Sequence, residues 1–345
     1  MAYTTINKST DYFNTKLYTG NGSTNAITGV GFQPDMTWLK IRTQSYSHRI
    51  YDAVRGATKY MHPDTTEEQY TTATSLTAFN SDGFTLGSNA GDNKSGDTFV
   101  SWNWKANGAG SANTDGGINS TVSVNNTAGF SIVKYGTGTG SATTVGHGLN
   151  AKPNFIIVKP IGTITTGGWI VGGDNIDSTY NEVSELNETA AKANDPSFND
   201  TAPTSSVFSV GNNNTNRSGE NYIAYCFVEK TGYSKFGSLT GNGSSNGTFV
   251  YCGFAPAFIM VKAKTSGNWF MYDNKRPGYN NVQQFLEADG SAVEYTSNAN
   301  HSIDILSNGF KFTGGSGSNT SGRENFFMAF GQSIVGSNNI PAVAR

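Results

Sequence analysis

The chain has little charge and no long apolar run. Charged residues make up 14% of the 345 residues, compared with about 25% in an average domain. The net charge is −2 and the basic residues are scattered, so the electrostatic footprint of a nucleic-acid partner is missing. No stretch is apolar over about 18 residues, and the first ten residues lack the basic and apolar regions of a secretory signal. These absences predict a soluble protein that is made in the cytoplasm and binds no membrane.

Residues that typically carry chemistry are also scarce. The two cysteines, Cys226 and Cys252, lie in apolar segments, so we expect buried free thiols, with a bond between them left open. The four histidines have no zinc-site spacing, and there is no Gly-x-Ser-x-Gly elbow. The run Gly136–Gly140 lacks the helix and the Lys-Ser/Thr pair of a phosphate loop. The sequence therefore predicts no cofactor, no metal site and no catalytic residue.

What the chain does contain is one pattern repeated three times. Each copy has a proline followed six residues later by a lysine, with an apolar, strand-like run between them: Pro34 to Lys40, Pro153 to Lys159 and Pro256 to Lys262. A Gly-x-Gly turn, predicted to be a hairpin turn, comes before each run and starts at Gly20, Gly138 and Gly241. An aromatic-rich strand closes each copy: Phe99–Trp104, Tyr222–Phe227 and Asn325–Phe330. A period near one hundred residues is typical of whole small domains rather than solenoid repeats.

The repeats predict the domain organisation. We assign the first repeat, with a short N-terminal segment, to residues 1–108, the second to 129–231 and the third to 232–335. Residues 109–128 are rich in Gly, Ser and Asn and are predicted to be a flexible or turn-rich linker. Residues 336–345 form a C-terminal tail, which is interpreted either as a docking peptide anchored by Ile340 and Val343 or as a frayed end.

Each repeat is expected to be a β-sandwich or jelly-roll-like domain. The chain has 42 glycines and 12% aromatic residues, and it reads as short strands between Gly, Asn and Asp clusters. The exception is Asn181 to Asn194, where apolar residues recur at helical spacing and predict one short helix. The closing strand Tyr222–Phe227 carries bulky residues on both faces, which predicts a central position in its sheet. The lysine after each apolar run is expected to mark the exit into solvent.

The best candidate for a ligand-contact site is the loop after the second apolar strand of each repeat. Its carboxylates, guanidinium groups and a nearby aromatic ring are the usual parts of a sugar-binding face. The residues concerned are Asp52, Arg55, Asp174, Trp269, Asp273 and Arg276. A structural Asp-Arg ion pair that fixes the loop is the interpretation we favour, because the second repeat has Asp174 without the arginine. Calcium binding by the Asp-rich and Asn-rich loops is left open.

Long segments of the chain resemble a known family of virion proteins. They include MAYTTINKSTDYFNTKLYTGNGST, FNSDGFTLGS, SWNWKANGAGS, FNDTAPTSSVFSVG, ENYIAYCFVEKTGYSKFGSLTGNGS and FKFTGGSGSNTSGRENFFMAF. The family is carried by tailed bacteriophages, many of them marine, and consists of repeats of a domain with no assigned activity. Its members are often described as tail-fibre or other particle proteins. The resemblance implies a virion location and no enzyme, and it carries over no site residues. The chain departs from the pattern at Asn325, where the family usually has an aromatic residue.

We therefore expect a non-enzymatic structural or adhesive virion protein, most simply a tail-fibre-like appendage that contacts host surface glycans. Capsid decoration is the alternative. A polysaccharide-degrading enzyme is a weaker one, because it needs a pair of carboxylates at a defined separation and no such pair recurs in the repeats. The doublet Glu67-Glu68 lies in a polar, loop-like stretch. The expected partners are other virion proteins and further copies of the chain, for example in a trimer.

Overall fold

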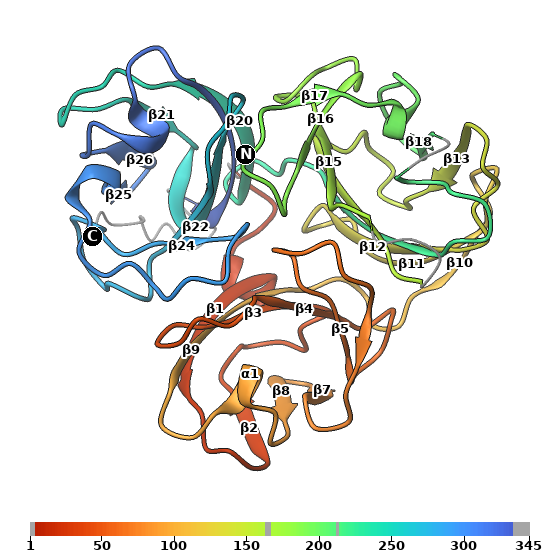
Figure 1. Ribbon diagram of the computed structural model, residues 1–345, viewed down its shortest axis with the longest axis horizontal. Helices are drawn as coiled ribbons and strands as arrows, with labels where there is room; N and C mark the ends of the chain where they lie inside the picture. Colours follow the sequence, from red (N-terminus) through yellow and green to blue (C-terminus); the bar gives the residue numbers. More distant parts are fainter. Residues whose placement is uncertain (1–3, 163–166, 212–213, 334–345) are drawn as a thin grey trace.

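The chain folds into three lobes around a common centre, one lobe for each sequence repeat (Figure 1). This computed structural model describes residues 4–162, 167–211 and 214–333. We call residues 4–106 lobe 1, the described part of 107–228 lobe 2, and 229–333 lobe 3. Each lobe pairs an inner sheet, which faces the centre, with a smaller outer sheet, and the named strands pair in antiparallel fashion. The prediction of an all-β fold is confirmed.

Lobe 1 has a four-stranded inner sheet in the order β1-β9-β3-β4 and an outer sheet in the order β2-β8-β7. The inner strands are β1 (Phe13–Thr19), β9 (Thr98–Trp104), β3 (Met36–Ile41) and β4 (Arg49–Asp52). The outer strands are β2 (Asn25–Thr28), β8 (Gly83–Leu86) and β7 (Leu76–Asn80). The remaining elements are the pair β5 (Lys59–Tyr60) and β6 (Tyr70–Thr71), the helix α1 (Ala90–Asn93) and the 3-10 turn η1 (Ser9–Asp11).

Lobe 2 has an eight-stranded inner sheet in the order β10-β11-β12-β19-β14-β15-β16-β17 and an outer pair, β13-β18. The inner strands are β10 (Ser111–Asn113), β11 (Ser120–Asn125), β12 (Phe130–Tyr135), β19 (Tyr222–Phe227), β14 (Phe155–Pro160), β15 (Ile170–Gly173), β16 (Glu182–Glu185) and β17 (Ala193–Asn194). The remaining elements are β13 (Thr143–Gly146), β18 (Val207–Val210) and the 3-10 turn η2 (Pro196–Phe198).

Lobe 3 has a five-stranded inner sheet in the order β20-β27-β22-β23-β24 and an outer sheet in the order β21-β26-β25. The inner strands are β20 (Ser234–Thr240), β27 (Glu324–Ser333), β22 (Phe254–Ala263), β23 (Trp269–Asp273) and β24 (Leu286–Glu287). The remaining elements are β21 (Phe249–Tyr251), β26 (Gly309–Phe312), β25 (Ile303–Leu306), and the 3-10 turns η3 (Ala299–His301) and η4 (Gly317–Asn319). In the described part of the chain, no helix is long and apolar enough to span a membrane.

The aromatic closing strands β9, β19 and β27 lie in the middle of the three inner sheets. On one side they pair with β1, β12 and β20, respectively. On the other side they pair with β3, β14 and β22, the strands that carry the Pro-to-Lys runs. Alternate residues of β19 therefore point into different cores: Tyr222 and Cys226 into that of lobe 2, and Tyr225 and Phe227 into the centre. The predicted central position is confirmed.

A single apolar cluster at the centre contains residues from all three lobes, while each lobe also has a cluster of its own. Phe330 of lobe 3 shows how closely the lobes meet, because its ring centroid lies 5.5 Å from that of Phe13 in lobe 1 and 5.8 Å from that of Phe227 in lobe 2. Aromatic pairs at these distances add to the stabilisation that comes from burying apolar area. The three lobes therefore share one apolar core and form a single body.

The helix predicted over Asn181 to Asn194 does not form. The segment contains the strands β16 and β17, and its apolar residues point into different cores, with Val183 in the cluster of lobe 2 and Leu186 in the central one. The carbonyl of Thr189 also accepts a hydrogen bond from Gly267 of lobe 3. Tertiary contacts therefore override the helical spacing.

The segment 109–128 is not a free linker, because β10 and β11 extend the inner sheet of lobe 2. Its few apolar residues explain this placement, since Ile118 and Val122 are buried in the core of lobe 2. The domain boundaries themselves stay a prediction. The predicted C-terminal tail, with Ile340 and Val343, lies outside the described residues.

The Gly-x-Gly turns are not hairpins, because each joins an inner strand to an outer strand: β1 to β2, β12 to β13 and β20 to β21. The last glycine of each turn has nearly the same positive φ, 70° at Gly22 and 71° at both Gly140 and Gly243. A buried asparagine fixes each turn by accepting a backbone N–H on its side-chain oxygen; these residues are Asn93, Asn216 and Asn319. Glycine and asparagine therefore make the same inter-sheet corner in every lobe.

Both cysteines are free and buried, as predicted. Burial raises the pKa of the Cys252 thiol to about 12, and it raises that of Cys226 as well. Both thiols are therefore inert packing groups.

Candidate functional site

The candidate residues Asp52 and Arg55 form a buried ion pair at the junction of lobes 1 and 2. The Asp52 carboxylate accepts hydrogen bonds from the backbone N–H of Arg55 (2.8 Å) and from its Nε. Arg55 also donates from Nη2 to the carbonyl of Ile50 at 2.9 Å. From lobe 2, the hydroxyl of Tyr225 donates to Asp52 Oδ2 at 2.8 Å. The ion pair thus fixes the conformation of its own loop and also binds the Tyr225 hydroxyl of the neighbouring lobe.

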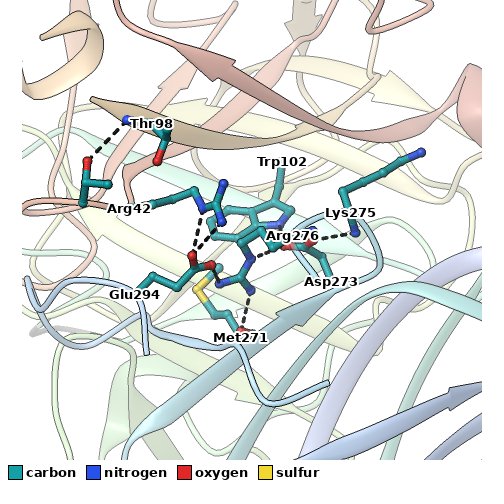
Figure 2. A network of polar contacts seen from close by, with 9 residues as sticks. Arg42, Thr98, Trp102, Met271, Asp273, Lys275, Arg276 and Glu294 are labelled. Carbon is teal, nitrogen blue, oxygen red and sulfur yellow. Dashed lines mark hydrogen bonds and ion pairs between the residues drawn. The ribbon is translucent and has the colours of Figure 1, made fainter. Parts of the chain in front are cut away.

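The same arrangement recurs between lobes 3 and 1 (Figure 2). Arg276 Nε lies 2.6 Å from Asp273 Oδ2, and its Nη2 donates to the carbonyl of Met271 at 2.8 Å. The donor from the neighbouring lobe is the indole Nε1 of Trp102, 3.1 Å from Asp273 Oδ2. Trp102 and Tyr225 occupy the same position in their closing strands. Two of the three junctions therefore use one design.

The junction of lobes 3 and 1 extends further through Glu294 (Figure 2). Its carboxylate lies 2.9 Å from Arg276 Nη1 and 2.8 Å from Arg42 Nη2 of lobe 1, and its own N–H donates to the carbonyl of Arg42. Burial raises the pKa of Asp273, but Arg276 and two backbone N–H groups more than offset this effect and hold its pKa below the usual range. The carboxylate is thus ionised and fully partnered.

Among the described residues, the junction of lobes 2 and 3 has no such network. The pairing of β14 with β15 places Gly173, not Asp174, at the position of the two aspartates, and Ile176 stands where they have an arginine. The facing position in the closing strand of lobe 3 is Met328, which has no hydrogen-bond donor. Asp174 is half-buried and pairs with Lys152 at 2.7 Å. The aspartate, the arginine and the hydrogen-bond donor of the neighbouring lobe are thus all replaced at this junction, by glycine and two apolar residues.

Trp269 is buried and joins two lobes through its indole. Its Nε1 donates to the carbonyl of Glu185 in lobe 2 at 3.0 Å, and the corresponding Trp169 donates to the carbonyl of His62 in lobe 1 at 2.8 Å. In lobe 1 this position is taken by His48, which is fully buried. The ring of Trp269 is therefore unavailable for stacking on a sugar.

Sequence reasoning missed the lysine that ends each Pro-to-Lys run. All three lysines are buried, although a solvent exit was predicted. Lys40 donates to the carbonyl of Ser291 in lobe 3 at 3.2 Å, and the others reach lobes 1 and 2 in the same cyclic order: Lys159 to Thr66 (3.0 Å) and Lys262 to Ala190 (2.9 Å). The recurrence of the lysine at one repeat position was the available signal.

Burial lowers the pKa of Lys40, Lys159 and Lys262 to about 8. Each ammonium group has backbone carbonyls around it rather than a carboxylate at ion-pair distance among the described residues. Carbonyl oxygens replace part of the lost hydration, so the groups remain charged at neutral pH. These lysines act chemically as hydrogen-bonded connectors between lobes.

The five candidate residues other than Asp174 are thus buried in lobe junctions, in line with the structural interpretation of the two ion pairs. Glu67 and Glu68 are exposed side by side. In the part of the chain that the structure describes, no group of three or more His, Cys, Asp or Glu side chains could hold a metal ion. What the arrangement does is fix three sandwiches rigidly against one another.

No curated protein and no solved structure is matched by this chain. A protein-family comparison matches almost all of the described fold, residues 8–333, and therefore spans all three lobes. The chain belongs to the family described as a domain of unknown function (DUF7483).

Proposed function

We propose that this protein is a non-enzymatic structural and adhesive component of a tailed-bacteriophage particle, a fibre-like appendage that contacts host surface glycans. The resemblance of its segments to phage virion proteins motivates the proposal. The observation that carries it is the locking of three sandwiches around one apolar centre, with charged and polar groups of the junctions directed inward. Such a body is rigid and presents its outer sheets and loops to partners.

The outer sheet of lobe 3 is the best surface for a glycan. On β21, the side chains of Phe249 and Tyr251 are 45% and 56% exposed. The corresponding positions of β2 in lobe 1 are the small residues Ala26 and Thr28. Exposed aromatic rings offer apolar faces on which sugar rings stack. We therefore move the proposed ligand contact from the buried aspartate loops to this strand.

Labelling of intact particles tests the proposed location. Gold-conjugated antibodies raised against the purified chain should mark the tail of the phage. Labelling spread over the head would contradict the fibre assignment, and absence of the protein from purified particles would contradict the whole proposal.

Head decoration is the second candidate function, and the cyclic arrangement of the three lobes favours it. A chain whose three lobes contact one another in cyclic order suits a threefold-symmetric site on a particle, and it presents three similar surfaces there without forming a trimer. Self-association of the chain remains part of the proposal, and sedimentation of the purified protein measures it directly.

Glycan contact and enzymatic activity are distinguished with host polysaccharide. We expect retention of the protein on immobilised polysaccharide, weakened about tenfold or more in Tyr251→Ala by loss of a stacking ring. Thr28→Ala on the equivalent strand of lobe 1 is the matched control and should bind normally. Release of reducing sugar that a single Asp or Glu substitution abolishes would instead favour a polysaccharide-degrading enzyme.

A further inference from the structure

The first inner strand of lobe 1 is an open sheet edge. In the strand order β1-β9-β3-β4, β1 is the end strand and has a partner on one side only among the described residues. Its counterpart in lobe 2, β12, has partners on both sides, because β11 covers the edge that is open in lobe 1. An open edge exposes unpaired backbone N–H and C=O groups and is a template for strand addition.

The register shows which residues an added strand would cover. Phe13 of β1 and Phe130 of β12 occupy the same position, opposite the last residue that pairs in their closing strands. Residues 14–17 of β1 therefore correspond to residues 131–134 of β12, which pair with residues 124–121 of β11. The chain itself thus demonstrates in lobe 2 how this edge accepts an extended segment.

A hollow of about 310 Å³ lies along this part of β1. It is lined by the four consecutive residues Asn14, Thr15, Lys16 and Leu17, together with Gly29 and Lys275. Consecutive strand residues point to opposite faces of a sheet, so a hollow lined by all four follows the edge rather than one face. The space lies where β11 would be if lobe 1 were built like lobe 2.

The side chains around the hollow include one buried hydroxyl without a partner and two ammonium groups outside ion pairs. Thr15 is 5% exposed, and its Oγ1 is buried with no hydrogen-bond partner. Neither Lys16 nor Lys275 belongs to any ion pair within the described residues. Lys16 does act on the exposed Asp82 carboxylate, whose pKa is lowered by the backbone N–H groups of Gly29 and Gly31 and by this lysine. The Lys275 ammonium points away from the Asp273–Arg276 network (Figure 2). A buried unpaired hydroxyl is costly, and two ammonium groups outside ion pairs favour an anionic occupant.

We propose that the edge of β1 binds an extended, acidic segment of another protein by β-strand addition. The backbone of the segment pairs with residues 14–17, and an acidic side chain lies opposite Lys16, near Lys275. A second copy of this chain fits less well, since pairing two β1 edges would bring two lysines together. The proposal is independent of whether the protein is located on the tail or the head.

Synthetic peptides based on β11 provide the probe. The peptide of residues 119–126 (NSTVSVNN) contains Val122, which pairs with the β12 residue equivalent to Lys16. We expect saturable binding of the Val122→Glu peptide to the full chain by titration calorimetry, about threefold or more tighter than that of the Val122→Lys peptide. In the protein variant Lys16→Glu this order should reverse. Lys134→Glu, on the edge already covered by β11, is the matched control and should leave the order unchanged.

Two results would overturn the proposal. One is the lack of saturable binding of any of the peptides up to about 1 mM with correctly folded protein. The other is an order of affinities that Lys16→Glu does not reverse, since the peptides would then bind elsewhere. Sedimentation of Lys16→Thr completes the test: self-association without peptide binding would assign the edge to a second copy.

Discussion

Each lobe inserts one buried lysine among carbonyl groups at the border with its neighbour. The position of these lysines was predictable from the repeat, but their burial was not, because a lysine that ends a strand ordinarily extends into solvent. Burial here depends on carbonyls that lie far away in the sequence, such as that of Ser291 for Lys40. A hydrogen bond between a lysine and a backbone carbonyl far away in the sequence leaves no local sequence pattern.

Lys159→Met is expected to destabilise the protein by about 1–3 kcal/mol, because the carbonyls of Thr66 and Gly167 lose their shared donor. The effect should depend on pH. The folded pKa is lowered from 10.5 to about 8, so the unfolded chain binds more protons between these values and the lysine's contribution to stability rises with pH in that window.

Urea unfolding at pH 7 and pH 9 measures both effects. The difference in free energy of unfolding between wild type and Lys159→Met should be larger at pH 9. Lys152→Met, at a partly exposed ion pair, is the control and should change stability by less than about 1 kcal/mol at either pH. An equal or smaller difference at pH 9 would contradict the lowered pKa.

At the scale of elements, the closing strands and the Pro-to-Lys strands were predictable because their apolar residues are contiguous. The helix predicted around Val183 and Leu186 was wrong because spacing alone cannot tell one apolar face from residues that enter two different cores. The Asp-Arg ion pairs were foreseen as one of two interpretations. Their partners from other lobes could not be, because nothing in the local sequence relates Asp52 to Tyr225.

The comparison of the three junctions predicts that the effects of Asp52, Arg55 and Tyr225 on stability depend on one another. Asp52→Gly alone should cost about 3–5 kcal/mol, because it leaves Arg55 buried without its carboxylate. The triple variant Asp52→Gly, Arg55→Ile, Tyr225→Met copies the junction of lobes 2 and 3 and should be more stable than the single variant. Denaturant titration compares them.

Asp174→Ala is the control for this series, because its partly exposed pair with Lys152 should contribute less than about 1 kcal/mol. A triple variant less stable than Asp52→Gly would show that the three positions are independent and that the comparison between junctions fails.

His48 makes the junction of lobes 3 and 1 sensitive to acid. Its Nδ1 accepts a hydrogen bond from Trp38 Nε1 at 2.9 Å, so protonation would break this bond. Burial, with Lys40 nearby, lowers the pKa of His48 well below 6.5. The stabilisation from the neutral ring is therefore complete above pH 6.5 and is lost as the pH falls below that value.

The indole N–H resonance of Trp38 should consequently remain unchanged from pH 8 to 6.5 and shift only well below 6.5. His48→Gln should show a smaller loss of stability in acid than wild type. His147→Gln, which removes another buried histidine, should leave the pH dependence of the Trp38 indole N–H resonance unchanged. A shift of Trp38 centred near pH 6.5 would show an ordinary, accessible histidine.

On the scale of the whole molecule, the sequence repeats suggest separate domains, whereas the structure has a shared centre. The closing strands are consistent with a shared centre, because they carry large side chains on both faces. In an isolated sandwich, one face of the middle strand would expose these side chains to solvent. An isolated second repeat, residues 129–231, would expose Ile223, Tyr225 and Phe227 to water. We expect it to aggregate or remain unfolded, as circular dichroism and sedimentation would show; a soluble, folded monomer would contradict the need for the centre.

The most direct test of the shared core uses the five tryptophans as reporters, with Trp38, Trp102 and Trp104 in lobe 1, Trp169 in lobe 2 and Trp269 in lobe 3. Uniform 5-fluorotryptophan labelling allows urea unfolding of every lobe to be followed by fluorine NMR in one sample. If the lobes form one cooperative body, all five resonances lose their native signal with the same midpoint. Separate midpoints for Trp169, Trp269 and the lobe 1 tryptophans would show three independent domains and contradict the shared core.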